Sequence, residues 1–318
     1  MARRLLIGFM LAAAAVSAAI GWGYREFHLA VSHPPVTVVI EPGTTVAQMA
    51  EVLGRAGVIR RPWLFRALAR WHGSERALKA GEYLFHDGLS AWAVYQMVRQ
   101  GKVRLFRITL IEGWTMREMA AYLERQPFAW PGFAADFLAA CRSSELLSLV
   151  GLGGKDNGPN ATLEGYLFPD TYDIPRPKRV DEVARRLVQE FQRRFGTSMR
   201  ERASALGLSM HQAVTLAAII EKETGAAAER ALVSSVFHNR EDADGRADLS
   251  DPHPYNTYIH PGLPPGPIAN PGLASLEAAL NAAQTDYLYF VSKNDGTHAF
   301  AATYAEHARN VTQYQRHR

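Results

Sequence analysis

The longest apolar stretch of the chain lies close to its N-terminus. Residues 5–23 contain no charged side chain, and as a helix they would extend about 28 Å, enough to cross the hydrocarbon core of a bilayer. Arg3 and Arg4 precede this stretch, which predicts a cytoplasmic tail at 1–4, a transmembrane anchor at 5–24 and export of everything that follows. A cleaved signal peptide is the alternative, because small residues near the end of the stretch would suit a signal peptidase, and it would export the same domains.

Two similar stretches further along each join a β-rich run to an amphipathic helix. They read VVIEPGTTVAQMAEVL at 38–53 and LIEGWTMREMAAYL at 110–123. Each contains a Thr followed three residues later by Gln or Glu, which is the spacing of a capping box at a helix N-terminus. These pairs are Thr45 with Gln48 and Thr115 with Glu118. The pattern therefore predicts two similar strand–helix units.

A change of composition at residues 151–160, GLGGKDNGPN, indicates a loop between domains. We therefore expect a linker at 25–35, a compact α+β module at 36–150 and a second α+β domain at 151–318. Apolar spacing in the second domain predicts three further elements. These are a helix at 180–195, a helix at 273–283 with its cap near Ser275, and a buried strand at 285–293.

One carboxylate interrupts an apolar helical face in the second domain. Ser209 and Gln212 are spaced as a capping box before the run MHQAVTLAAIIEKET. At about 100° per residue, Glu221 falls among the apolar side chains of this helix, whereas Glu223 falls at the edge of the arc. A carboxyl group in apolar surroundings resists ionisation, which suits a general acid. The alternative is a structural carboxylate that a buried partner satisfies.

A second polar cluster lies in the Pro- and Gly-rich stretch YNTYIHPGLPPGPIANPG at 255–272. This composition forbids a helix and restricts the backbone, so the stretch is expected to form a stiff loop. Aromatic rings and amides on a stiff loop suit sugar rings, which stack and hydrogen-bond, and the alternative is a purely structural crossover. The residues expected to bind substrate are Tyr255, Asn256, Tyr258 and Asn270.

Charge and cysteine content exclude several other classes of function. The chain has 35 Lys and Arg against 31 Asp and Glu, spread as singles and pairs, so nucleic acid is not an expected partner. Cys141 is the single cysteine, and the 11 His lack the spacing of a metal site, so neither a metal nor a cofactor is expected. Cys141 itself lies in an apolar helical stretch, which favours a buried thiol.

Five segments of the second half, in one order, resemble the endolytic murein transglycosylase (YceG-like) family. They are EGYLFPDTY at 164–172, LAAIIEKETG at 216–225, VSSVFHNR at 233–240, the Pro-rich stretch at 255–272, and TDYLYFV at 285–291. The resemblance covers nearly the whole chain. It implies one N-terminal membrane helix, a LysM-like region at 36–150 and a C-terminal catalytic domain. It also implies that the first Glu of the EKET motif, Glu221, is the essential glutamate.

The resemblance further implies a lyase of peptidoglycan. Such an enzyme cleaves nascent glycan strands between N-acetylmuramic acid and N-acetylglucosamine, leaves 1,6-anhydro ends and terminates elongation. It implies a single-pass protein of the cell inner membrane with a periplasmic catalytic domain, working beside cell-wall synthases. One carboxylate suffices for this chemistry, whereas an ordinary glycosidase would need a second one, for which Asp251, Asp170 and Glu164 are the candidates.

The chain departs from the family pattern at residues 241–253. A longer segment containing LQSDPT is usual there, and only the run from Leu249 to Pro252 resembles it, so Asp251 is expected to be its substrate-binding remnant. The alternative function is therefore an anchored peptidoglycan-binding protein with a shortened, weakly active or inactive catalytic domain.

Overall fold

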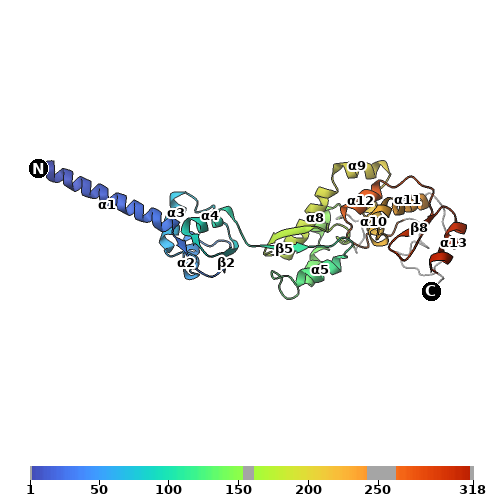
Figure 1. The fold of residues 1–318 in the computed structure, drawn as a ribbon, viewed down its shortest axis with the longest axis horizontal. Helices are drawn as coiled ribbons and strands as arrows, with labels where there is room; N and C mark the ends of the chain where they lie inside the picture. Colours follow the sequence, from blue (N-terminus) through green and yellow to red (C-terminus); the bar gives the residue numbers. More distant parts are fainter. Residues whose placement is uncertain (1, 153–160, 242–262, 316–318) are drawn as a thin grey trace. The chain divides into compact units, whose positions relative to one another are not determined.

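A computed structural model describes residues 2–152, 161–241 and 263–315 (Figure 1). Packing separates two compact units: unit 1 is Met1–Phe106 with Asp173–Arg176, and unit 2 is Arg107–Tyr172 with Pro177–Arg318. Residues 107–150, which the sequence analysis grouped with the first module, lie in unit 2, because two of the helices they form pack on α8 (Val180–Arg194) of that unit. Both units mix helices with small antiparallel sheets, which agrees with the expected α+β class.

The N-terminal helix α1 (Ala2–His28) contains the apolar stretch. By length and composition, its segment Ile7–His28 could cross a membrane, and a signal sequence would have the same features. The helix continues through the first residues of the expected linker, ending at His28. The pair α9 (Thr197–Ala205) and α10 passes the same composition test with a bend of 94°, but α10 is a core helix of unit 2.

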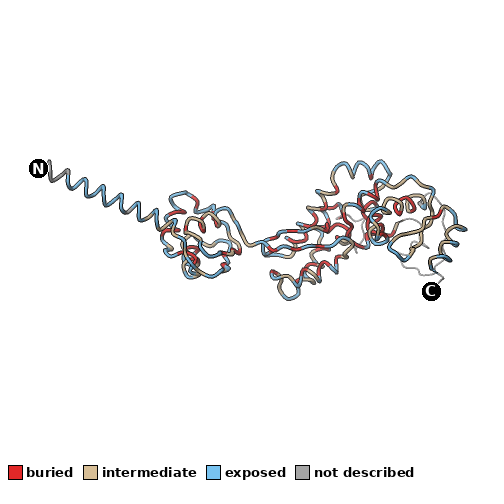
Figure 2. Tube along the Cα trace, in the orientation of Figure 1, coloured by how far each residue is buried: buried red, intermediate tan, exposed pale blue. Residues whose placement is uncertain are grey.

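The rest of unit 1 consists of short strands and three helices around one apolar core (Figure 2). The elements are β1 (Ala30–Val31), β2 (Val36–Ile40), α2 (Val46–Arg55), α3 (Pro62–Trp71), β3 (Gly81–Phe85), β4 (Leu89–Ser90) and α4 (Ala91–Gln100). Strands β2 and β3 pair antiparallel, with Val38 opposite Tyr83, and β1 pairs with β4. Leu53, Phe65 and Tyr95 bring the three helices onto this core. The likeness of this unit to a LysM domain stays a prediction.

Unit 2 is mostly helical. Its elements are α5 (Met116–Glu124), α6 (Phe133–Ala140), α7 (Ser144–Leu149), α8 (Val180–Arg194), α9, α10 (Met210–Glu223), the short helix η2 (Ala227–Glu229), α11 (Arg230–Glu241), α12 (Leu273–Leu280), β7 (Tyr289–Ser292), β8 (His298–Ala301) and α13 (Tyr304–Gln315). Strands β5 (Leu105–Thr109) and β6 (Thr171–Pro175) pair with each other, and each crosses the boundary between the units. Helix α10 packs against α11 and α12, which places it in the core of the unit.

The three capping boxes expected from the sequence are all present. The side chains of Thr45, Thr115 and Ser209 each accept a hydrogen bond from the backbone N–H three residues on, at 3.2 to 3.3 Å. The side-chain oxygen of the Gln or Glu at that position accepts a hydrogen bond from the backbone N–H of the cap residue. The two copies of the strand–helix repeat therefore form as predicted, although they lie in different units. Cys141 is buried, as expected, and burial raises the pKa of its thiol.

Two local predictions are wrong. Helix α12 is capped by Gly272 and not near Ser275, because the buried Ser275 hydroxyl accepts a hydrogen bond from Arg230 (3.1 Å). The strand expected at 285–293 is shorter, Tyr289–Ser292, and its residues are half-buried, because it pairs only with β8 in a two-stranded sheet.

Candidate active site

Glu221 lies in the last turn of α10, on its buried side. Helix residues from Ala213 to Ile220 are all buried, and the Glu221 side chain is 8% exposed, whereas Glu223 is exposed. The structure therefore places Glu221 where the apolar spacing of the helix predicts it. The backbone N–H of Gly272 donates a hydrogen bond of 3.0 Å to its Oε2 atom.

Arg230 supplies the positive charge beside Glu221. It begins α11, and its guanidinium lies 3.7 Å from Glu221 Oε1 while donating to Ser275 at 3.1 Å. Gly272 is the N-cap of α12, so the partial positive charge of that helix terminus also lies next to Glu221. Arg230 and the Gly272 N–H group therefore lie against the two carboxylate oxygens of the buried Glu221 side chain.

A second carboxylate, Glu112, lies in the same neighbourhood. It belongs to the loop between β5 and α5, and a Cβ atom built on Gly272 would fall 2.0 Å from Glu112 Oε1. Burial and then repulsion by Glu221 raise the pKa of Glu112, whereas attraction to Arg230 acts in the opposite direction. Sequence reasoning used the run LIEGWTM only for the fold and missed this residue. The signal present was a Glu at the end of a strand, two residues before Trp114.

The loop carrying Glu112 approaches α10 closely because of Gly113. This residue has a φ of +75°, which favours glycine, and a Cβ atom there would lie 3.4 Å from Glu221 Cγ. The Gly113 carbonyl accepts a hydrogen bond from Lys222 at 3.4 Å. Trp114 follows, half-buried, with its ring 5.4 Å from that of Tyr122. An aromatic ring therefore belongs to the loop that contacts the buried glutamate.

Asn270, expected from the sequence to bind substrate, is instead fully buried and hydrogen-bonded at every polar atom of its amide. Its Oδ1 accepts from the N–H groups of Gly165 (2.9 Å) and Leu167 (3.0 Å). Its Nδ2 donates to the Trp114 carbonyl (3.0 Å) and to Glu164 (2.8 Å). These bonds fill the capacity of the amide and join three distant segments around the Glu112 loop.

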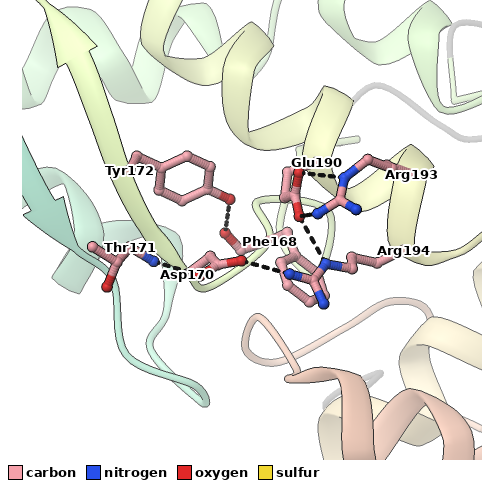
Figure 3. A network of polar contacts seen from close by, with 7 residues as sticks. All are labelled: Phe168, Asp170, Thr171, Tyr172, Glu190, Arg193 and Arg194. Carbon is pink, nitrogen blue, oxygen red and sulfur yellow. Dashed lines mark hydrogen bonds and ion pairs between the residues drawn. The ribbon is translucent and has the colours of Figure 1, made fainter.

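Two candidates for a second catalytic carboxylate have other partners. Asp170 accepts from Arg194 (2.8 Å) and from the N–H of Thr171 (2.7 Å), in a network that also includes Glu190 and Arg193 (Figure 3). Glu164 accepts from the N–H of Met116 (2.8 Å) and from Asn270. The structure brings Glu112, and neither of these two, into electrostatic contact with Glu221.

Glu164 is expected to make stability depend on pH. Burial raises its pKa from 4.5 to about 7, although hydrogen bonds from Met116 and Asn270 act in the opposite direction. Because the folded pKa exceeds the unfolded one, this contribution is fully present below pH 4.5 and is lost as the pH rises through about 7. Over that window the melting temperature of the native protein should fall relative to that of Glu164→Gln. Parallel melting curves that keep a constant separation would contradict this.

Four of the residues predicted to bind substrate lie outside the described residues. They are Asp251, Tyr255, Asn256 and Tyr258. Within the part of the chain that the structure describes, no group of three or more His, Cys, Asp or Glu is arranged to hold a metal ion.

Comparisons with known proteins extend over most of the chain. A model of the YceG-like family matches residues 38–313. An endolytic murein transglycosylase of Bacillus subtilis is 29% identical over 312 aligned positions, covering 89% of this chain and 86% of that protein. One of Streptococcus pneumoniae is 26% identical over 361 aligned positions, covering 98% of this chain and 65% of that longer protein. The crystal structure of a putative YceG-like protein from Listeria monocytogenes has 25% identity and a TM-score of 0.55, covering 86% of this chain and 98% of that one.

Fold and site together define an α+β protein with a buried glutamate at the end of a core helix, flanked by an arginine and a second carboxylate. The extent of the family match then decides the identification. The chain belongs to the YceG-like family, and the resemblance found in the sequence is confirmed.

Proposed function

We propose that this protein is a lytic transglycosylase that cleaves peptidoglycan strands between N-acetylmuramic acid and N-acetylglucosamine. The observation that carries the proposal is the buried Glu221 between Gly272 N–H and Arg230, in a chain related to proteins named endolytic murein transglycosylases. Trp114, in the adjoining loop, is the ring we propose to stack on a sugar. The alternative of a binding protein without turnover rests on the short segment 241–253, of which all but the first residue lies outside the described residues.

In the proposed mechanism Glu221 acts first as an acid and then as a base. It protonates the glycosidic oxygen, the bond from that oxygen to the anomeric carbon breaks, and the departing sugar leaves with a hydroxyl group. Arg230 and Gly272 N–H then stabilise the Glu221 carboxylate. That carboxylate accepts the proton of the muramyl 6-hydroxyl as this oxygen bonds to the anomeric carbon. The result is a 1,6-anhydro end, and no water is consumed.

Asn270 and Glu112 support this chemistry in different ways. We propose that Asn270 positions the Glu112 loop and does not contact the substrate, since its amide is buried and saturated. We propose that Glu112 places a second negative charge beside Glu221, since the two carboxyl groups lie close enough for the charge of Glu221 to raise the pKa of Glu112. The substrate contacts expected of Asp251, Tyr255, Asn256 and Tyr258 remain predictions from the sequence.

Product analysis tests the proposed reaction. Purified full-length protein is incubated with glycan strands, and mass spectrometry identifies the new ends. Anhydro ends on fragments released from inside the strands would support the lytic transglycosylase. Reducing ends on those fragments would indicate a hydrolase. Binding without new ends would favour the alternative function.

Glu221→Gln should lower the pKa of Glu112, because the negative charge of Glu221 is one of the causes that raise it. Carbon-13 NMR of the Glu112 carboxyl group over a pH series measures this pKa. Glu223→Gln is the matched control, because it removes the same charge from an exposed position on the same helix. An unchanged pKa of Glu112 in Glu221→Gln, or an equal shift in the control, would exclude this electrostatic contact.

We propose further that α1 anchors the protein in the inner membrane and that both units lie in the periplasm. The support is the uncharged stretch preceded by Arg3 and Arg4. A phosphatase reporter that is active only outside the cytoplasm, fused after Arg318, should therefore be active in cells. An inactive reporter on an intact fusion would contradict the proposed orientation and place the C-terminus in the cytoplasm. Association with cell-wall synthases is part of the same proposal and rests on the family alone.

A further inference from the structure

The outward face of α3 combines aromatic and basic side chains. Its inward face is buried in the core of unit 1 through Leu64, Phe65, Leu68 and Ala69. On the opposite side, Trp63 is 49% and Trp71 is 88% exposed, and Arg66 and Arg70 are exposed beside them. A Trp that is nearly nine-tenths exposed is costly in water, because a large apolar area stays hydrated. This outward face is therefore a surface that a partner would stabilise.

Positive charge is concentrated around this face. The segment 60–77 contains five Arg and one Glu, an excess of four positive charges, which equals the excess of the whole chain. All five arginines are exposed. An anionic surface is the partner that such a charge distribution attracts.

The contacts of α3 with α1 indicate which anionic surface this is. The ring of Trp63 stacks on Trp22 of α1, with centroids 6.2 Å apart and an angle of 18° between the planes. Arg61 lies 5.3 Å from the Trp22 ring and 3.4 Å from Glu26 of the same helix. Trp22 stands at the end of the apolar stretch, at the depth where Trp is typical of a membrane interface. Helix α3 therefore lies beside the C-terminal part of α1, where the apolar stretch ends (Figure 1).

We infer that the outward face of α3 rests on the anionic phospholipid headgroups of the membrane that α1 enters. Trp63 and Trp71 lie at the level of the headgroups, and Arg66 and Arg70 bind lipid phosphates. The inference rests on the proposal that α1 is a retained anchor. A sugar strand could stack on Trp71 alone. Such a partner would explain neither the excess of arginine nor the contact of Trp63 with Trp22. This contact would hold unit 1 against the membrane surface.

A fluorescent label at position 67 can test this contact. Ala67 is exposed between Trp63 and Trp71 on the same face, so Ala67→Cys places a dye in the proposed interface. Cys141 needs no replacement, because it is buried and its raised pKa keeps the thiol unreactive. The control label is Leu105→Cys, at an exposed position outside α3, where β5 begins.

The labelled full-length chains are reconstituted into vesicles of phosphatidylglycerol and phosphatidylcholine that carry a nitroxide quencher on the headgroup. We expect strong quenching at position 67 and little at position 105. Arg66→Gln with Arg70→Gln should lower the ratio of docked to undocked protein on the order of 30-fold. Arg99→Gln with Lys102→Gln is the matched control, since it removes two exposed charges elsewhere on the unit and should leave the quenching unchanged.

The outcomes separate this inference from the proposed anchor. Flotation of the chain with the vesicles reports insertion of α1 on its own. A chain that floats but shows equal, weak quenching at both positions overturns the docking of α3 and leaves the anchor intact. A chain that does not float overturns both. If added glycan strands changed the fluorescence of the dye at position 67 and the nitroxide vesicles did not quench it, the face would bind sugar. That result would overturn the inference.

Discussion

Cleavage of glycan strands should fall by roughly 10² or more in Glu221→Gln, the scale expected when an acid–base group is removed. The amide keeps the shape of the side chain and can still accept the hydrogen bond from Gly272, so the fold should survive. It can neither give a proton to the glycosidic oxygen nor take one from the muramyl hydroxyl. Release of anhydro ends over time measures the effect.

Glu223→Gln is the control for this substitution. Glu223 lies two residues further along α10 and is exposed, so its loss should change the cleavage rate little. If Glu223→Gln abolished cleavage and Glu221→Gln left it intact, the assignment of the acid to the buried side of α10 would be wrong. Equal melting temperatures of the two variants would exclude unfolding as the cause of lost activity.

Asn270→Ala should destabilise unit 2 by on the order of 3–5 kcal/mol, because a buried group without its hydrogen-bond partner costs about 1–3 kcal/mol. The substitution leaves the N–H groups of Gly165 and Leu167 and the carbonyl of Trp114 without the amide. It also removes the side-chain bond from residue 270 to the loop that carries Glu112, and leaves two backbone bonds in place. Denaturant unfolding and the cleavage rate should therefore both change.

Asn281→Ala is a matched control, because Asn281 is exposed and its side chain donates to a single carbonyl, that of Glu277. It should cost less than about 1 kcal/mol, the net contribution of one ordinary hydrogen bond. An equal loss of unfolding free energy in the two variants would show that the Asn270 amide does not hold the distant segments of unit 2 together. Normal stability with lost cleavage in Asn270→Ala would instead return this residue to the substrate-binding role expected from the sequence.

Local features were predictable from the sequence. A capping box spans four residues and an apolar arc spans a few turns, so the helix starts and the burial of Glu221 follow from spacing alone. Long-range features were not. Asn270 donates a hydrogen bond to Trp114, which is 156 residues away in sequence. The carboxyl groups of Glu112 and Glu221 both lie against Gly272. Neither contact leaves a periodic signal, so the sequence did not predict that Asn270 would be buried and would join distant segments.

The unit boundary shows the same limitation. The Gly-rich run at 151–160 predicted a border between domains, but the second strand–helix repeat packs in unit 2. Composition reports where the backbone is free to turn, whereas a boundary depends on which apolar faces meet. The apolar face of α5 meets α6, and α6 meets α8, so these helices lie together whatever the composition of the loop between them.

The missing side chain of Gly272 constrains the variation of the site among related proteins. Its N–H group faces Glu221, and the place of its absent Cβ atom is already filled by the carboxyl group of Glu112. Any larger residue at position 272 would need a shorter or displaced residue at position 112. The two positions, 160 residues apart in sequence, should therefore vary together. A relative with a side chain at the first position and Glu at the second would have to arrange its two carboxylates differently.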